Sequence, residues 1–219
     1  MTGAPHSTPP PLPELEPVLA QVRADAAAGR FESWGSSTLI DEFTGVPSIP
    51  RELFDALHAA AGIRAEFPVG NAGLLHVYGY WFSRVPTPFG YKRDRWADGA
   101  LARALGRPAD EFLLGATPAG TTLARVTRAA LPVLRTPPAG ARVADAVFAA
   151  NRSLRRARVV LHAAEPAGPT ALVSGIGTAG PHGGTPLRLI TTFPVSGDPD
   201  QLLADFARDP GSRWNAVAD

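Results

Sequence analysis

The chain has 219 residues, of which 45% are hydrophobic, and this length and composition suit one globular domain with its own core. Its 21 basic and 20 acidic residues give a formal net charge of +1, which supplies no overall field to attract a nucleic acid. The absence of cysteine excludes disulfides, thiolate catalysis and sulfur-bound zinc. No apolar run approaches the roughly 20 residues of a membrane span. The amino terminus lacks the pattern of a signal peptide, so we expect a cytoplasmic protein without a membrane partner.

The first residues predict a tail and two helices. Residues 1–13 are predicted to be disordered, because their prolines and small polar residues cannot bury enough surface to offset the entropy of ordering. Residues 14–219 are predicted to form a single domain. Apolar residues at helical spacing predict one helix that starts near Glu14 and ends at Gly29, and another that starts at Pro50 and ends at Gly62.

Residues 73–85 are the strongest strand candidate, because aromatic and branched residues dominate them and turn formers lie on both sides. Alternation along a strand would place His76, Tyr78, Tyr80, Phe82 and Arg84 on one face. Aromatic walls with polar tips are typical of a ligand-lining surface. A strand buried under a helix would present the same side chains with satisfied hydroxyls, so both interpretations stay open.

The remaining chain predicts further helices and most of a sheet. Residues 92–105 favour a helix that ends at Gly106, and residues 121–134 favour a strand broken at Pro132. Residues 111–115 and 142–150 fit either state, whereas 158–164, 172–177 and 187–195 favour strands and 200–208 a helix. The predicted fold is α+β, with amino-terminal helices packed on a mainly antiparallel sheet, open or barrel-like, and a short carboxy-terminal helix.

Lys92 is the only lysine, in a chain whose other basic positions are arginine. A lysine amine can lose its proton in an apolar pocket and act as a base or trap a carbonyl, whereas a guanidinium stays protonated. All three tyrosines and two of the four tryptophans lie within residues 78–96, so aromatic side chains and the amine share one short segment. The alternative is a solvated surface lysine with no chemical role.

Three residues are candidate catalytic groups: Lys92, His76 and Glu66, a carboxyl group with apolar neighbours for which a solvated loop position is the alternative. The candidate substrate-binding residues are aromatic or cationic, and they are Tyr78, Tyr80, Phe82, Tyr91, Arg93, Arg95 and Trp96. Arginines suit a carboxylate, and aromatic faces suit a flat ring or a cation. No nucleotide-binding or metal-binding motif is present, so we expect no cofactor and no metal.

Two segments carry a resemblance to a known family: residues 76–96 (HVYGYWFSRVPTPFGYKRDRW) and residues 187–195 (LRLITTFPV). With them the chain resembles small actinobacterial enzymes of natural-product gene clusters, in particular bacterial Pictet-Spenglerases that build β-carbolines. The resemblance implies a cofactor-independent condensation of tryptophan or tryptamine with an aldehyde. In that reaction an iminium forms, the indole attacks it, and a base removes the ring proton.

Two other functions are compatible with the sequence. The carboxy-terminal TTFP strand resembles that of small microbial ribonucleases, which cut RNA without metal and would use His76, Lys92, Arg93 and Tyr91. The balanced charge argues against this role. The third hypothesis is a small-molecule-binding protein without turnover. A small aromatic partner is common to the first and third hypotheses, and an aromatic-rich edge would suit a homodimer.

Overall fold

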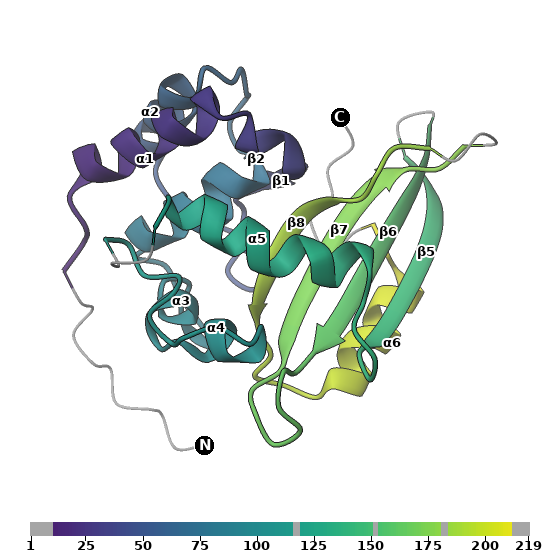
Figure 1. The fold of residues 1–219 in the computed structure, drawn as a ribbon. Helices are drawn as coiled ribbons and strands as arrows, with labels where there is room; N and C mark the ends of the chain where they lie inside the picture. Colours follow the sequence, from purple (N-terminus) through teal and green to yellow (C-terminus); the bar gives the residue numbers. More distant parts are fainter. Residues whose placement is uncertain (1–10, 116–118, 151–152, 181–183, 212–219) are drawn as a thin grey trace.

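The computed structural model describes residues 11–115, 119–150, 153–180 and 184–211, which divide into a helical half and a sheet (Figure 1). Helices α1 (Leu15–Ala27) and α2 (Arg51–Ala61) pack against each other. Gly29 and Gly62 follow them with φ of 65°, a left-handed conformation that glycine adopts without strain. Both predicted helices are therefore confirmed. Residues 1–10 of the predicted tail lie outside the described residues.

A two-stranded antiparallel ribbon lies next to the helices. It pairs β1 (Ser36–Thr38) with β2 (Val69–Asn71), and a short 3-10 helix, η1 (Arg30–Ser33), precedes it. Gly35, the residue before the ribbon, contacts the main sheet through a backbone hydrogen bond from its N–H to the Leu189 carbonyl, 2.8 Å long. This contact places the ribbon between the helical half and the sheet.

The strand predicted over residues 73–85 is wrong. The chain forms a π-helical turn, η2 (Leu74–Tyr78), followed by a 3-10 turn, η3 (Gly79–Phe82). Residues 74–80 are all buried, so the two alternating faces of the strand prediction do not exist. The Asn71 side chain accepts hydrogen bonds from the N–H groups of Gly73 and Leu74, at 3.0 and 3.4 Å, and so caps the start of the helical segment.

The helix predicted over residues 92–105 is present in two pieces. A small hairpin of β3 (Pro86–Thr87) and β4 (Gly90–Tyr91) leads into α3 (Asp94–Ala97) and then α4 (Ala100–Ala104). The break lies at Gly99, whose φ is 70° and whose missing Cβ would lie 2.6 Å from the Ala109 carbonyl oxygen. Backbone conformation and close packing both require glycine there, and this explains the interruption.

The strand favoured for residues 121–134 is also wrong, because this segment is helix α5 (Thr122–Arg135). The Thr121 hydroxyl accepts a hydrogen bond from the Ala124 N–H and caps the first turn. The buried face is built by apolar residues at helical spacing, namely Leu123, Val126, Ala130, Val133 and Leu134. Burial of that face outweighs the loss of one backbone hydrogen bond at Pro132, which lies inside the helix.

The main sheet has four antiparallel strands in the order of the chain: β5 (Arg142–Ala150), β6 (Ser153–His162), β7 (Ala171–Thr178) and β8 (Arg188–Pro194). The sheet is open, not a closed barrel. Helix α5 covers one face and α6 (Pro199–Arg208) the other (Figure 1). The predicted α+β class, the last three strands and the carboxy-terminal helix are confirmed. No helix among the described residues is long and apolar enough to cross a membrane.

Candidate functional site

A cavity of about 470 Å³ lies between the helical half, the carboxyl end of β8 and the start of α6. Four of the ten residues singled out in the sequence line it together: His76, Tyr80, Lys92 and Arg95. These four come from η2, η3 and the segment that follows the β3–β4 hairpin. The cavity therefore gathers the predicted amine, imidazole and one phenol, and we take it as the candidate site.

Lys92 is held inside this cavity by a buried carboxylate. Its Nζ lies 2.9 Å from Asp41 Oδ2, and both side chains are buried. Asp41 Oδ1 accepts hydrogen bonds from the backbone N–H groups of Phe43 and Thr44, at 3.0 and 2.9 Å. Burial raises the pKa of Asp41, but the bond and charge of Lys92 outweigh it and leave this pKa below its ordinary value. The amine is thus part of a fixed ion pair, not isolated in an apolar pocket.

Three further side chains continue this polar cluster. Lys92 Nζ donates to the Tyr80 hydroxyl at 3.3 Å and lies 4.6 Å from the centre of the Tyr80 ring. The Tyr80 ring stacks on the His76 ring with 4.8 Å between centroids. His76 Nε2 lies 3.3 Å from the hydroxyl oxygen of Ser37, which also lines the cavity.

His76 is neutral at physiological pH. Burial is the main cause that lowers the pKa of His76 to about 3, and the positive charge of Lys92 adds to it. The Ile190 backbone acts in the opposite direction, and Arg95 lowers the pKa further. A neutral imidazole can accept or donate a hydrogen bond, but with this pKa it is a weak proton acceptor.

The outer part of the cavity is aromatic. The rings of Phe43 and Phe89 meet edge to face with their centroids 5.3 Å apart. The guanidinium carbon of Arg95 lies over the ring of Phe193, from β8, at 5.0 Å from the ring centroid. All four residues line the cavity. The site thus joins an aromatic entrance to a polar interior.

Acidic side chains outnumber basic ones around the cavity. Its lining contains five carboxyl groups and two cationic groups other than histidine. The carboxyl groups belong to Asp41, Glu42, Asp94, Asp98 and Asp198, and the cations are Lys92 and Arg95. Since Asp41 and Lys92 neutralise each other, the remaining charge favours a cationic ligand and opposes a polyanion.

The other predicted substrate-binding residues do not line this cavity. Tyr78 is fully buried and donates to Asp25, and Trp96 packs in the core against Phe112. Phe82 packs against the same core. Arg93 is buried with its guanidinium 5.4 Å from the Tyr91 ring centre. Tyr78 and Phe82 are placed by the helical geometry of residues 74–82, which the strand interpretation did not contain, whereas Trp96 is turned into the core by α3.

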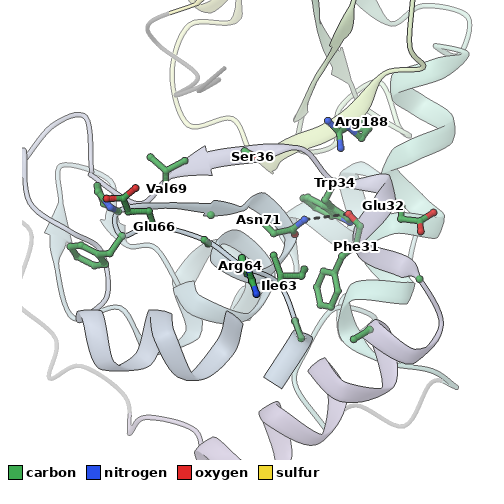
Figure 2. A pocket seen from close by; sticks show the side chains of 17 residues that line it. Phe31, Glu32, Trp34, Ser36, Ile63, Arg64, Glu66, Val69, Asn71 and Arg188 are labelled. Atoms are coloured by element: carbon green, nitrogen blue, oxygen red, sulfur yellow. Dashed lines mark hydrogen bonds between the residues drawn. The ribbon is translucent and has the colours of Figure 1, made fainter. Parts of the chain in front are cut away.

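Glu66 lies in a second cleft, of about 830 Å³, beside the β1–β2 ribbon (Figure 2). Figure 2 shows Glu66 at one end of this cleft and Glu32 at the other, with Arg188 above. The Asn71 amide, drawn between them, donates to the Phe31 carbonyl at 3.3 Å. Glu66 is exposed. The structure therefore separates Glu66 from Lys92 and His76, in line with the alternative of a solvated loop glutamate.

Two residues of the polar cluster were not singled out from the sequence. Ser37 lies in a short strand with no distinguishing pattern. Asp41 precedes Thr44 and Gly45, and an aspartate followed by such residues is typical of a turn that its side chain caps. That signal predicts the turn, but the pairing with Lys92 joins residues 51 positions apart and cannot be found locally.

The described residues contain no group of three or more histidine, aspartate or glutamate side chains that could hold a metal ion. No protein-family model, curated protein or solved structure matches this chain.

Proposed function

We propose that the protein is a cofactor-independent enzyme of secondary metabolism that acts on an aromatic amine or amino acid. The observation that carries the proposal is one cavity with aromatic walls, an excess of carboxyl groups and a neutral imidazole. An arylalkylammonium ion has the matching features, since its flat ring suits the aromatic wall and its charge suits the carboxylates. In its specific form, the reaction is a Pictet-Spengler condensation of tryptophan or tryptamine with an aldehyde.

The cavity offers groups for each step of that reaction. The amine and the aldehyde condense to an iminium ion with loss of water, and the lining carboxylates stabilise this cation. The indole then forms a carbon–carbon bond to the iminium carbon, and loss of the ring proton restores its aromaticity. We assign the ring proton to one of the lining carboxylates, which outnumber the cations there, and a hydrogen-bonding role to His76, which is buried and stacked on Tyr80. Arg95, the lining cation that is not paired with Asp41, would bind the carboxylate of an amino acid.

The same geometry disfavours the ribonuclease alternative. A phosphodiester backbone would meet more carboxylates than cations, and the His76 imidazole is buried and neutral. Lys92, which would contact a phosphate, is already paired with Asp41. A binding protein without turnover would use the same cavity, so only a turnover experiment separates it from the enzyme.

The test is incubation of the protein with tryptamine or tryptophan and a set of simple aldehydes. We expect a product with the mass of amine plus aldehyde minus water, formed faster than without protein and enriched in one enantiomer. Lys92→Gln should lower kcat/KM roughly 100-fold, because it breaks the buried ion pair with Asp41 that anchors the two loops at the cavity. Arg128→Gln is the matched control, since it removes a surface cation that pairs with Glu111 outside the cavity.

Each other result assigns a different function. Binding of the amine without product supports the binding protein, and cleavage of RNA without added metal supports the ribonuclease. A racemic product formed at the uncatalysed rate would overturn the enzyme proposal.

A further inference from the structure

Two exposed phenylalanines stand at the entrance of the cavity. Phe43 and Phe89 are 46% and 51% exposed, and both line it. Among the large hydrophobic side chains that are exposed in the described part of the chain, these two are the aromatic ones. A single exposed apolar residue is ordinary, but two touching rings at the mouth of a polar cavity indicate a surface that receives a ligand.

The contact between these rings leaves room for a third ring. They meet edge to face at an interplanar angle of 73°, with centroids 5.3 Å apart. Such a contact uses the edge of one ring and a single face of the other. Further faces are therefore available to stack on a flat ligand or to meet its edge.

The backbone under both rings is fixed. Asp41 Oδ1 accepts from the Phe43 N–H at 3.0 Å. On the other loop, Thr87 Oγ1 accepts from the Phe89 N–H at 3.2 Å and donates to the Gly90 carbonyl at 2.7 Å. Because Asp41 also binds Lys92, which follows the second loop, one ion pair ties the two loops together. A ligand would meet rings whose backbone is already ordered, which lowers the entropic cost of binding.

The side chains that line the cavity differ in depth. The rings lie at the surface, whereas Lys92, His76 and Tyr80 are between 5 and 7% exposed. We infer that Phe43 and Phe89 form an aromatic clamp that holds the planar ring of the substrate at the entrance, where its amine lies within reach of the exposed lining carboxyl groups of Glu42, Asp98 and Asp198. This inference rests on the proposed function and deepens it, because it names the two residues that select flat aromatic amines over other amines.

The test compares two amines of equal charge by isothermal titration calorimetry. Tryptamine has a flat ring, and 2-cyclohexylethylamine has an apolar ring without a π face. Phe43→Leu and Phe89→Leu keep apolar volume but remove the aromatic face. Each should weaken tryptamine binding about 3- to 10-fold, the range expected for one aromatic contact, and change the cyclohexyl amine less than about twofold. The double variant should weaken tryptamine binding by less than the product of the two single fold-changes, because the rings touch.

Controls separate the clamp from folding and from the proposed function. Val46→Ala alters another exposed side chain, 44% exposed, close to Phe43 in sequence, and should leave both affinities and the melting temperature unchanged. Equal losses for the two amines, or no loss for tryptamine, would overturn the clamp alone. A wild-type protein that binds no tryptamine would overturn the proposed function and the clamp together.

Discussion

Two buried carboxyl groups organise this protein, and they differ in what surrounds them. Asp25, in α1, pairs with Arg30 at 2.8 Å and accepts hydrogen bonds from the Tyr78 and Thr121 hydroxyls. Asp41 pairs with Lys92 and accepts bonds from its own loop. Each carboxyl group therefore has a cation and several donors. The first group is sealed between α1, η2 and α5, whereas the second borders the cavity.

The tyrosines show how this difference arises. Tyr78 and Tyr80 are two residues apart, and two helical steps of about 100° each turn their side chains to nearly opposite sides. Tyr78 therefore reaches Asp25, and burial followed by the charge of Asp25 raises the pKa of this phenol. Tyr80 instead reaches Lys92 and the cavity. The same residue type therefore has a structural role at position 78 and lines the candidate site at position 80. The difference is whether the side chain reaches the cavity.

The strongest test of this comparison is the removal of the structural carboxyl group. Asp25→Ala should lower the free energy of unfolding by about 3–5 kcal/mol, because it removes the charged acceptor of two hydroxyl hydrogen bonds, one of them from the fully buried Tyr78. Urea unfolding measures the change, and the tryptamine affinity of the folded variant should be unchanged. Asp145→Ala is the control, since its carboxyl group is 42% exposed and pairs with Arg156 and Arg158 on the sheet, so its loss should cost less than that of Asp25. Similar losses in both variants would contradict a structural role for Asp25.

The pH dependence of stability tests the environment of the second carboxyl group, where His76 is buried in the same polar cluster. The pKa of His76 is 6.5 when unfolded and about 3 when folded, so between these values the unfolded state binds more protons. The contribution of His76 to the free energy of unfolding should thus be fully present above pH 6.5. Below that pH it should decline by up to about 1.4 kcal/mol per pH unit. In His76→Gln this decline should be shallower. Burial also lowers the pKa of His58, which keeps part of the slope. An identical slope in the variant would refute the burial effect at His76.

The smallest expected effect compares the two phenols directly. Tyr78→Phe should cost about 1–3 kcal/mol of stability, because it removes a donor from a buried carboxyl group. Tyr80→Phe should cost less than about 1 kcal/mol, since Lys92 keeps its bond to Asp41. Binding should respond in the opposite order, with tryptamine affinity changed in Tyr80→Phe alone. Thermal unfolding and calorimetry give both quantities, and equal responses would remove the distinction between the two sites.

Much of the fold follows from local patterns. The ends of α1 and α2 at Gly29 and Gly62 and the start of α6 after Asp198 are capping signals that the sequence contains. The failures share one cause. Residues 74–80 and helix α5 are rich in aromatic, branched or small apolar residues that suit either state, and long-range burial selects the helix. Asn71 and Thr121 are residue types that cap the start of a helix, and they were the sequence evidence against a strand in these two segments.

The candidate site was less accessible to sequence reasoning. Lys92 drew attention by its rarity, and the segment around it does contribute Tyr80 and Arg95 to the cavity. Asp41 and Phe193 come from distant parts of the chain and meet Lys92 and Arg95 only in three dimensions. Glu66 has apolar neighbours in sequence, yet it faces a different cleft. Local composition therefore located the neighbourhood but not the partners that define its chemistry.

The ion pair between Asp41 and Lys92 has an evolutionary consequence. Since both ring-bearing loops are anchored to it, their outer positions can mutate while the anchor and the groups beneath stay in place. Under the proposed function, relatives that keep this pair but vary at positions 43 and 89 would differ in preferred substrate and share one reaction. Ligand preference in such a lineage would then change at the entrance, while the buried polar cluster of Ser37, His76, Tyr80 and Lys92 stays the same.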